Sequence, residues 1–302
     1  MDALVLKPDF SSLSRNIDDY PDGIIIPIDK PYRWTSADVI RKVKFAAIRH
    51  FGKKNLKVGH AGTLDPLATG VLLVCIGKAT KLAEELQSHD KEYVAGITLG
   101  ATTPSYDLEK EIDRFFPHEH ISETSVREAL PAFIGEQDQV APLFSAKSVD
   151  GVRAYELARK LHAEGRTLDE AAQELIRVSK INITELELIA FHRQAAASDV
   201  KDMETTPSAE TATESSRQPS DKSQVSTASS RINVTDNSAL GLPRAVVRMA
   251  CSKGTYVRAF ARDLGESLGS GAHLDSLQRS RSGIFRVENA LTVDQAIKIL
   301  TF

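Results

Sequence analysis

Apolar residues recur in short runs with the alternating period of β-strands along much of the chain. In the clearest run, Tyr93, Ala95, Ile97 and Leu99 fall on one face, and this alternation is typical of a strand that buries one side. The same reasoning predicts strands at residues 23–29, 71–77, 91–100, 178–191 and 243–251, the last two as the arms of a hairpin.

Segments with helical spacing separate these strands. Thr35 and Ser36 offer an N-cap for a helix that continues to about His50, with Ile40 and Val43 on its apolar face. Strands and helices that alternate irregularly agree with an α+β fold, although they do not fix its topology. Further helices are predicted at residues 78–86, 122–133, 153–163 and 168–176, and after Gly254.

Residues 194–240 depart from both patterns. They contain 16 Ser or Thr in 47 residues and no aromatic residue, so they cannot bury enough apolar surface to offset the entropy lost on ordering. We therefore expect a disordered, dispensable insert at 194–243, between two parts of one domain at 21–193 and 244–302. Residues 1–20 form an N-terminal extension in this scheme.

Composition limits the class of protein. With 302 residues, of which 41% are hydrophobic, the chain can bury a full core. Cys75 and Cys251 lie far apart in apolar runs, as expected of reduced thiols rather than of a disulfide or a metal site. The sequence shows neither a signal peptide nor an apolar run of membrane-spanning length, which predicts a soluble, cytoplasmic protein.

The overall charge does not suggest a nucleic-acid-binding protein. The net charge is −3 and the pI is near 6.3, so such a role would need a local basic cluster. One such cluster is at residues 248–286, with seven Arg or Lys against three acids. This stretch is a credible surface for a nucleic-acid backbone, and Gly254, before a helix start, would leave free N–H groups for an anion.

One polar loop with three glycines organises the rest of the sequence. Residues 58–70 read VGHAGTLDPLATG and lead directly into the apolar strand at 71–77. Asp65 is the only acid in this loop, which makes it a candidate nucleophile or base on a rigidly held loop. On turn statistics alone, an Asp-Pro pair more often only starts a turn.

This loop belongs to an ordered series of motifs that resembles one known family. The series resembles the bacterial tRNA pseudouridine-55 synthases, the TruB family of pseudouridine synthases, from about residue 20 to residue 293. Its members are DKP at 29–31, GHAGTLDPLATG at 59–70, KEY at 91–93, FSAK at 144–147, RAYE at 153–156 and SKGTYVR at 252–258.

The resemblance implies both a fold and a reaction. The fold is the α+β pseudouridine-synthase fold, with a central mixed, mainly antiparallel sheet flanked by helices. The reaction isomerises the T-arm uridine (position 55) of tRNA to pseudouridine, by cleaving the N1–C1′ bond of a flipped-out uridine and rejoining the base through C5. The resemblance implies no metal and no cofactor, and we expect a cytoplasmic monomer that does not contact membranes.

It also implies three catalytic residues. Asp65 matches the catalytic carboxylate, which would attack either the ribose C1′ or the base C6. Arg258 matches its partner, whose guanidinium would lower the pKa of the carboxyl group and fix its direction. Tyr93 matches the tyrosine that stacks on the flipped base and is a candidate to handle the C5 proton.

Further positions are implied to bind the substrate. His60 would occupy the place left in the T loop when bases are extruded, and Leu277 would line the uracil pocket. Four basic residues in family segments are expected to contact RNA phosphates, namely Lys30, Lys81, Arg153 and Lys253.

The sequence departs from the family pattern in three places. Residues 102–107 read TTPSYD, which keeps only the last acid of the Thr-Asp-Thr-x-Asp segment found in many members. Residues 165–177 are longer than expected, and the 194–240 insert is extra. The chain ends soon after Val293, which leaves no room for a C-terminal RNA-binding domain, so we expect the catalytic domain itself to supply RNA affinity.

Three other interpretations stay open. The chain could be a pseudouridine synthase for another RNA. It could be an RNA chaperone that folds tRNA independently of chemistry, in which case Asp65→Asn leaves its effect on tRNA folding intact. In a purely structural interpretation, Asp65, Tyr93 and Arg258 are unrelated turn and core residues that do not converge in space.

Overall fold

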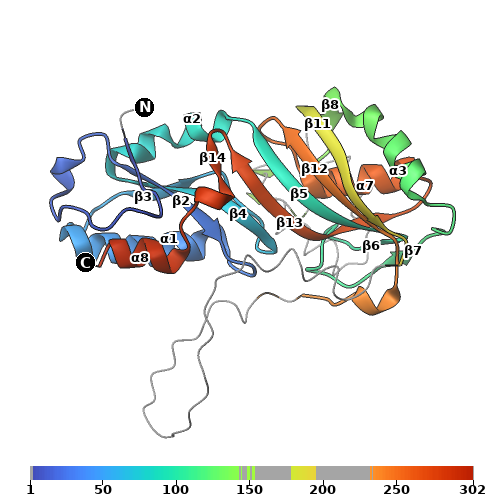
Figure 1. Ribbon diagram of the computed structural model, residues 1–302, viewed down its shortest axis with the longest axis horizontal. Helices are drawn as coiled ribbons and strands as arrows, with labels where there is room; N and C mark the ends of the chain where they lie inside the picture. The colour runs from blue at the N-terminus through green and yellow to red at the C-terminus, as the bar shows by residue number, and fades with distance from the viewer. Residues whose placement is uncertain are drawn as a thin grey trace, which may run out of the picture.

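The computed structural model describes residues 3–142, 144, 148–149, 152–153, 178–194, 232 and 234–301. These residues form one long twisted sheet with helices packed along it (Figure 1). The strand order is β1-β2-β4-β13-β5-β12-β11-β8, with β3 also paired to β4 and β14 to β13. Within this sheet β1–β2 and β4–β13 are parallel and the other pairs are antiparallel. The predicted mixed, mainly antiparallel α+β architecture is confirmed.

The strands of this sheet are β1 (Leu4–Val5), β2 (Ile24–Lys30), β3 (Val58–Ala61), β4 (Ala68–Ile76), β5 (Lys91–Leu99), β8 (Gly135–Gln139), β11 (Ser179–His192), β12 (Arg244–Cys251), β13 (Ala272–Ser282) and β14 (Phe285–Arg286). Two small separate sheets pair β6 (Ala101–Thr102) with β7 (Arg114–Phe115) and β9 (Ser148–Val149) with β10 (Val152–Arg153). The α-helices are α1 (Ser36–Phe51), α2 (Ala83–Ser88), α3 (Glu123–Ala129), α7 (Val257–Ser267) and α8 (Val293–Ile299). Short 3-10 helices are η1 (Ile17–Asp19), η2 (Gly77–Leu82), η3 (Leu130–Phe133), η5 (Ser238–Leu240) and η6 (Val287–Asn289).

Helix α1 follows directly from its sequence signals. The Thr35 hydroxyl accepts a hydrogen bond from the Asp38 N–H and the Asp38 carboxylate accepts one from the Thr35 N–H, which forms a capping box. The helix ends at Gly52, whose φ of 61° is in the left-handed region that glycine adopts easily. Its apolar face packs with α8 against β2 and β4.

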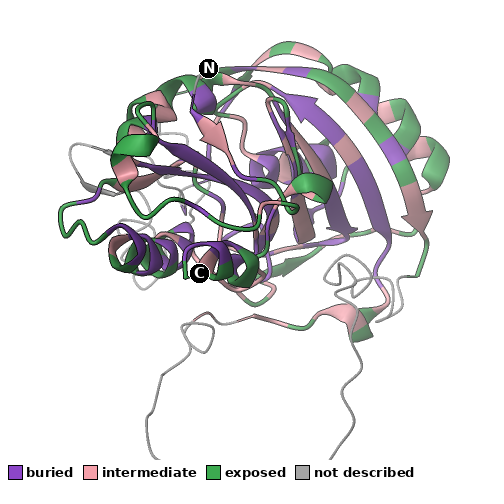
Figure 2. Cartoon of the chain, turned by 60° about the vertical axis from the view of Figure 1, so that its left-hand side comes forward, coloured by how far each residue is buried: buried purple, intermediate pink, exposed green. Residues whose placement is uncertain are grey.

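The two larger of three apolar cores among the described residues lie at the two ends of the sheet. One fills the space between α1, α8, β2 and β4, and the other lies between α7, α3 and the strands β5, β11, β12 and β13. Buried residues follow these strands in both halves (Figure 2). Tyr93 and Leu277 pack against both cores, so they mark the junction between the two halves.

Several predicted boundaries change. Residues 58–61 are not loop, because they form β3, which pairs with the end of β4. The segment predicted as one helix at 78–86 is the 3-10 helix η2 followed by α2, and that at 122–133 is α3 followed by η3. Arg153 lies in the short strand β10 and not at the start of a helix. The rest of the predicted helices at 153–163 and 168–176, and most of the 194–243 insert, fall outside the described residues.

Candidate active site

A cavity of about 230 Å³ opens where the two halves of the sheet meet. Its walls come from the loop at 62–65, from β5 and β13, and from the segment at 252–258 that leads into α7. Asp65, Tyr93 and Arg258 all line it, together with Leu277. The structural interpretation in which the three predicted catalytic residues do not converge is therefore wrong.

The Asp65 loop is tied down on both sides. On one side Leu64 bonds twice to the Ser36 hydroxyl, which accepts from the Leu64 N–H at 3.0 Å and donates to its carbonyl at 3.2 Å. On the other side the Gly70 N–H donates to the Asp29 carboxylate at 3.0 Å. Gly70 has a φ of 95°, and a Cβ there would lie 2.2 Å from the Arg279 carbonyl oxygen. Glycine is therefore required at position 70, near the start of β4.

Arg258 reaches Asp65 from the first turn of α7. Its Nε lies 2.9 Å from Asp65 Oδ2, and the side chains are 6% and 39% exposed, respectively. Its other nitrogens donate to the carbonyls of Ser105 at 3.0 Å and Phe144 at 2.8 Å. These three contacts fix the guanidinium plane, and hence the direction from which it holds the carboxylate.

Asp107 is a further member of this cluster. Its Oδ2 lies 3.8 Å from Arg258 Nε, and its Oδ1 accepts from the Ser105 hydroxyl at 2.6 Å and from the Glu109 N–H at 3.0 Å. Burial raises the pKa of Asp107, against the lowering effect of the Arg258 charge. Burial by itself lowers the pKa of Arg258, but Asp65 and Asp107 raise it above its ordinary value. Sequence reasoning kept this acid as a family feature without giving it a role.

Tyr93 and Arg279 face each other across the β5–β13 pair. Burial raises the pKa of the Tyr93 hydroxyl, and the Arg279 charge lowers it by less. Arg279 is buried, with Nε donating to the Val71 carbonyl at 2.7 Å and a terminal nitrogen donating to the Gly62 carbonyl at 3.2 Å. It lines the cavity, yet sequence reasoning counted it only within the basic stretch at 248–286. Arg279 could have been identified if residues 272–282 had been predicted as a β-strand that pairs with β5, since that pairing puts Arg279 opposite Tyr93.

Lys30 does not lie where the RNA-contact prediction placed it. Its side chain is fully buried, and Nζ donates to the carbonyls of Pro31 at 2.9 Å, Trp34 at 2.6 Å and Pro66 at 3.2 Å. Burial lowers its pKa to about 7, against the raising effects of Asp65 and Asp29. All three hydrogen bonds of Lys30 go to main-chain carbonyls. Through the bond to Pro66, the residue after Asp65, Lys30 holds the Asp65 loop in place instead of contacting a phosphate.

The remaining predicted binding residues differ in their distance from the cavity. Leu277 lines the cavity, and Lys253 is exposed at its rim. His60 lies on β3 outside the lining, where burial and then the Arg279 charge lower its pKa. Lys81 is exposed at a second cavity. The side chain of Arg153 lies outside the described residues.

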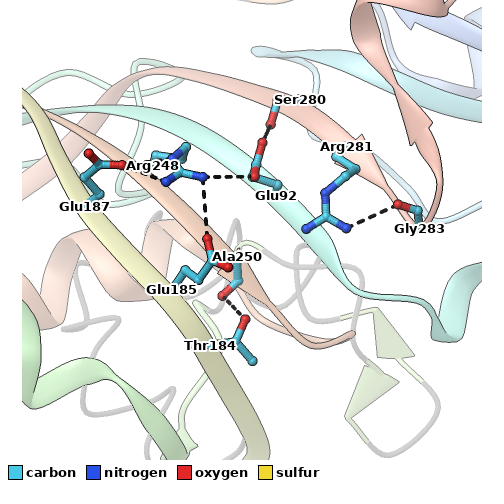
Figure 3. Close-up of polar contacts among 9 residues, drawn as sticks. All are labelled: Glu92, Thr184, Glu185, Glu187, Arg248, Ala250, Ser280, Arg281 and Gly283. Carbon is cyan, nitrogen blue, oxygen red and sulfur yellow. Dashed lines mark hydrogen bonds and ion pairs between the residues drawn. The ribbon is translucent and has the colours of Figure 1, made fainter.

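The basic stretch at 248–286 is largely neutralised. Arg248 makes ion pairs with Glu187 at 2.7 Å, Glu92 at 3.4 Å and Glu185 at 3.5 Å, and Figure 3 shows these carboxylates gathered around its guanidinium. Arg262 pairs with Asp263 at 2.7 Å, while Arg258 and Arg279 are buried in the site. Four of its seven basic residues are thus used inside the protein, so the predicted backbone-binding surface is weaker than the sequence count suggested.

The described residues contain no group of three or more His, Cys, Asp or Glu side chains placed to hold a metal ion. Within the same residues, no helix combines the length and apolar character needed to cross a membrane.

Comparison with known proteins identifies the class of enzyme. The fold resembles that of a chain in a solved "Cbf5-Nop10-Gar1 Complex", with a TM-score of 0.52 and 23% identity, over 92% of this chain and 55% of the other. The family model described as "TruB family pseudouridylate synthase (N terminal domain)" matches residues 49–206. The chain belongs to the TruB family of pseudouridine synthases, which makes it an isomerase.

Two curated relatives share most of their length with this chain. A protein from Phocaeicola vulgatus is 43% identical over 275 residues, which cover 91% of this chain and 92% of the relative. One from Bacteroides thetaiotaomicron is 44% identical over 269 residues, covering 89% of each. Both carry the name tRNA pseudouridine synthase B.

Proposed function

We propose that this protein converts the uridine at position 55, in the T arm of tRNA, to pseudouridine. One observation carries the proposal: the Asp65 carboxylate, held by Arg258, lies at the wall of a cavity that Tyr93 and Leu277 also line. A carboxylate, an aromatic ring and an apolar wall together suit a flipped-out pyrimidine. The names of the relatives supply the RNA class, and the sequence resemblance supplies the position.

The base must leave its stack to reach Asp65, because Asp65 lies in the wall of a cavity at the junction of the two halves of the sheet. Tyr93 offers a face for stacking on the uracil, and Leu277 packs on the same cavity from β13. Its rim carries Lys253, an exposed cation suited to a phosphate next to the flipped nucleotide.

Asp65 performs the chemistry as an ionised carboxylate. The Arg258 contact engages Oδ2, and the partly exposed carboxylate faces the cavity, where it can attack the ribose C1′ or the base C6. In either route the N1–C1′ bond breaks and a C5–C1′ bond forms. The C5 hydrogen leaves as a proton and N1 gains one, so the reaction is an isomerisation that needs no oxidant or reductant. Tyr93 and Tyr256 are the tyrosines that line the cavity, and the sequence resemblance favours Tyr93 as the one that handles the C5 proton.

The test is release of tritium from C5-labelled uridine in a T-arm stem-loop, with the modified position mapped by mass spectrometry. We expect release from one uridine, at position 55, and no release when that uridine is replaced by cytidine. Tight binding of the stem-loop without any release would overturn the proposal and favour the chaperone. Release only from a different RNA would favour the alternative substrate.

A further inference from the structure

Unneutralised positive charge gathers in a place that the sequence count did not indicate. A second cavity, of about 420 Å³, lies at the far end of β4 from the Asp65 loop. Four lysines line it, namely Lys53, Lys57, Lys78 and Lys81, against one acid, Asp18. All four lysines are exposed, and no described carboxylate lies within ion-pair distance of their ammonium groups.

The β3–β4 hairpin brings these lysines together from two stretches of sequence. Val58 pairs with Ile76, and the Gly77 N–H donates to the Lys57 carbonyl at 2.9 Å, so Lys57 lies beside the start of η2. Lys78 and Lys81 follow on η2. Residues 53–57 and 78–81 are each basic, but only the fold brings them together at one cavity.

The N-terminal extension forms the opposite wall. Ile17 and Tyr20 line the cavity, and both also pack against the core under α1. The Tyr20 hydroxyl accepts from the Ser14 N–H at 2.6 Å, which fixes the ring. The cavity is therefore a built feature with a rigid apolar wall and a cationic rim, in contrast to Arg248, whose charge three glutamates already satisfy.

We propose that this lysine-lined cavity binds the phosphate backbone of the stem of the RNA substrate, at a distance from the reacting uridine. The proposal rests on the proposed function. Strand β4 has nine residues, and at roughly 3.3 Å per residue it places Lys78 and Lys81 about 30 Å from the strand end beside the Asp65 loop. The four residues of β3 place Lys57 closer, within about 17 Å of Gly62 in that loop. In an A-form RNA helix, whose rise per base pair is shorter than that of DNA, the longer distance corresponds to on the order of ten base pairs. A stem that leads away from the active site along β4 would thus place its phosphates on the lysines. The phosphate contact expected of Lys81 is thereby extended to Lys53, Lys57 and Lys78, which line the same cavity.

The experiment compares two hairpins with the same T loop, one with a stem of about four base pairs and one with about twelve, so that only the longer can reach the lysines. Dissociation constants are measured over a range of salt concentrations for the wild type and for K53Q/K57Q/K78Q/K81Q. For the long hairpin we expect at least about a tenfold loss of affinity at low salt, and a salt slope smaller by about three to four. For the short hairpin we expect equal binding by both proteins.

A control variant, K42Q/K44Q/K180Q/K298Q, removes the same number of charges from exposed lysines that line neither cavity, one of which, Lys180, pairs with Asp138 at 3.7 Å. We expect it to keep wild-type affinity and salt slope on the long hairpin. Equal losses for the two variants, or equal losses on the two hairpins, would overturn the proposal. Because the readout is a dissociation constant and not pseudouridine formation, failure here is distinct from failure of the proposed function, in which no pseudouridine forms on either hairpin.

Discussion

Two of the arginine–aspartate pairs among the described residues differ in how completely the carboxylate is satisfied. In the Arg244–Asp275 pair between β12 and β13, the side chains are 2% and 4% exposed, and the two contacts of 2.8 and 2.9 Å make a bidentate pair. Thr98 and Ser276 also donate to Asp275, at 2.9 and 2.8 Å. Asp65 has one side-chain partner among the described residues, Arg258, and its side chain is 39% exposed.

The difference separates a structural pair from a reactive one. The Asp275 oxygens are occupied by the donors around them, so this carboxylate has no lone pair to offer to a substrate. Asp65 gains direction from one guanidinium and keeps an oxygen facing the cavity. Under the proposed function, the same two residue types give stability in one place and chemistry in the other, according to how many donors surround the acid.

The largest expected effect is the loss of catalysis in Asp65→Asn. The amide keeps the size of the side chain and can still accept from Arg258, but it cannot act as a nucleophile. We expect the rate of pseudouridine formation to fall by at least about 10⁴-fold, with the free energy of unfolding within about 1 kcal/mol of wild type. Single-turnover tritium release measures the rate, and retained binding of the stem-loop is the control. A variant that keeps a substantial fraction of the wild-type rate would contradict the role of Asp65.

The reverse result is expected for Asp275→Asn. The substitution leaves the Arg244 guanidinium buried without a compensating charge, so the free energy of unfolding should fall by about 3–5 kcal/mol. Below its melting temperature the variant should keep a near-normal rate. Urea unfolding measures the loss. The double variant Arg244→Met/Asp275→Leu removes both charges and should recover most of it, and a double variant as unstable as the single one would contradict this account.

Arg258→Lys tests whether the direction of the Asp65 carboxylate matters. A single ammonium cannot reach Asp65 and the carbonyls of Ser105 and Phe144 together in the geometry of the planar guanidinium. We expect kcat to fall by about 10²–10³-fold, with a smaller change in KM, since the positive charge is kept. An unchanged kcat would mean that charge alone is sufficient at this position.

The sequence predicted the members of the reactive pair but not the surroundings that distinguish the two pairs. Motif resemblance named Asp65 and Arg258, and the β-period placed Tyr93 on an inward face. The burial of Lys30 and the role of Asp107 depend on contacts between segments distant in sequence, which a one-dimensional pattern does not contain. For the same reason, the basic count at 248–286 could not reveal that Glu92, Glu185 and Glu187 neutralise Arg248.

The expected effect that is least directly tied to the reaction concerns Lys30, which supports the loop of the reactive pair. Burial lowers the pKa of Lys30 from its ordinary value of 10.5 to about 7 in the folded protein. Between these values the unfolded chain binds more protons than the folded one, so this group makes the folded state more stable as pH rises. The stability of wild type relative to Lys30→Met should then be flat below about pH 7 and rise by up to about 1.4 kcal/mol per pH unit above it. Urea unfolding of both proteins across this range measures the difference. If the free energies of unfolding of the two proteins differ by the same amount at every pH, the three carbonyl acceptors keep Lys30 protonated throughout this range. The Asp65 loop would then be held by a lysine that is always charged.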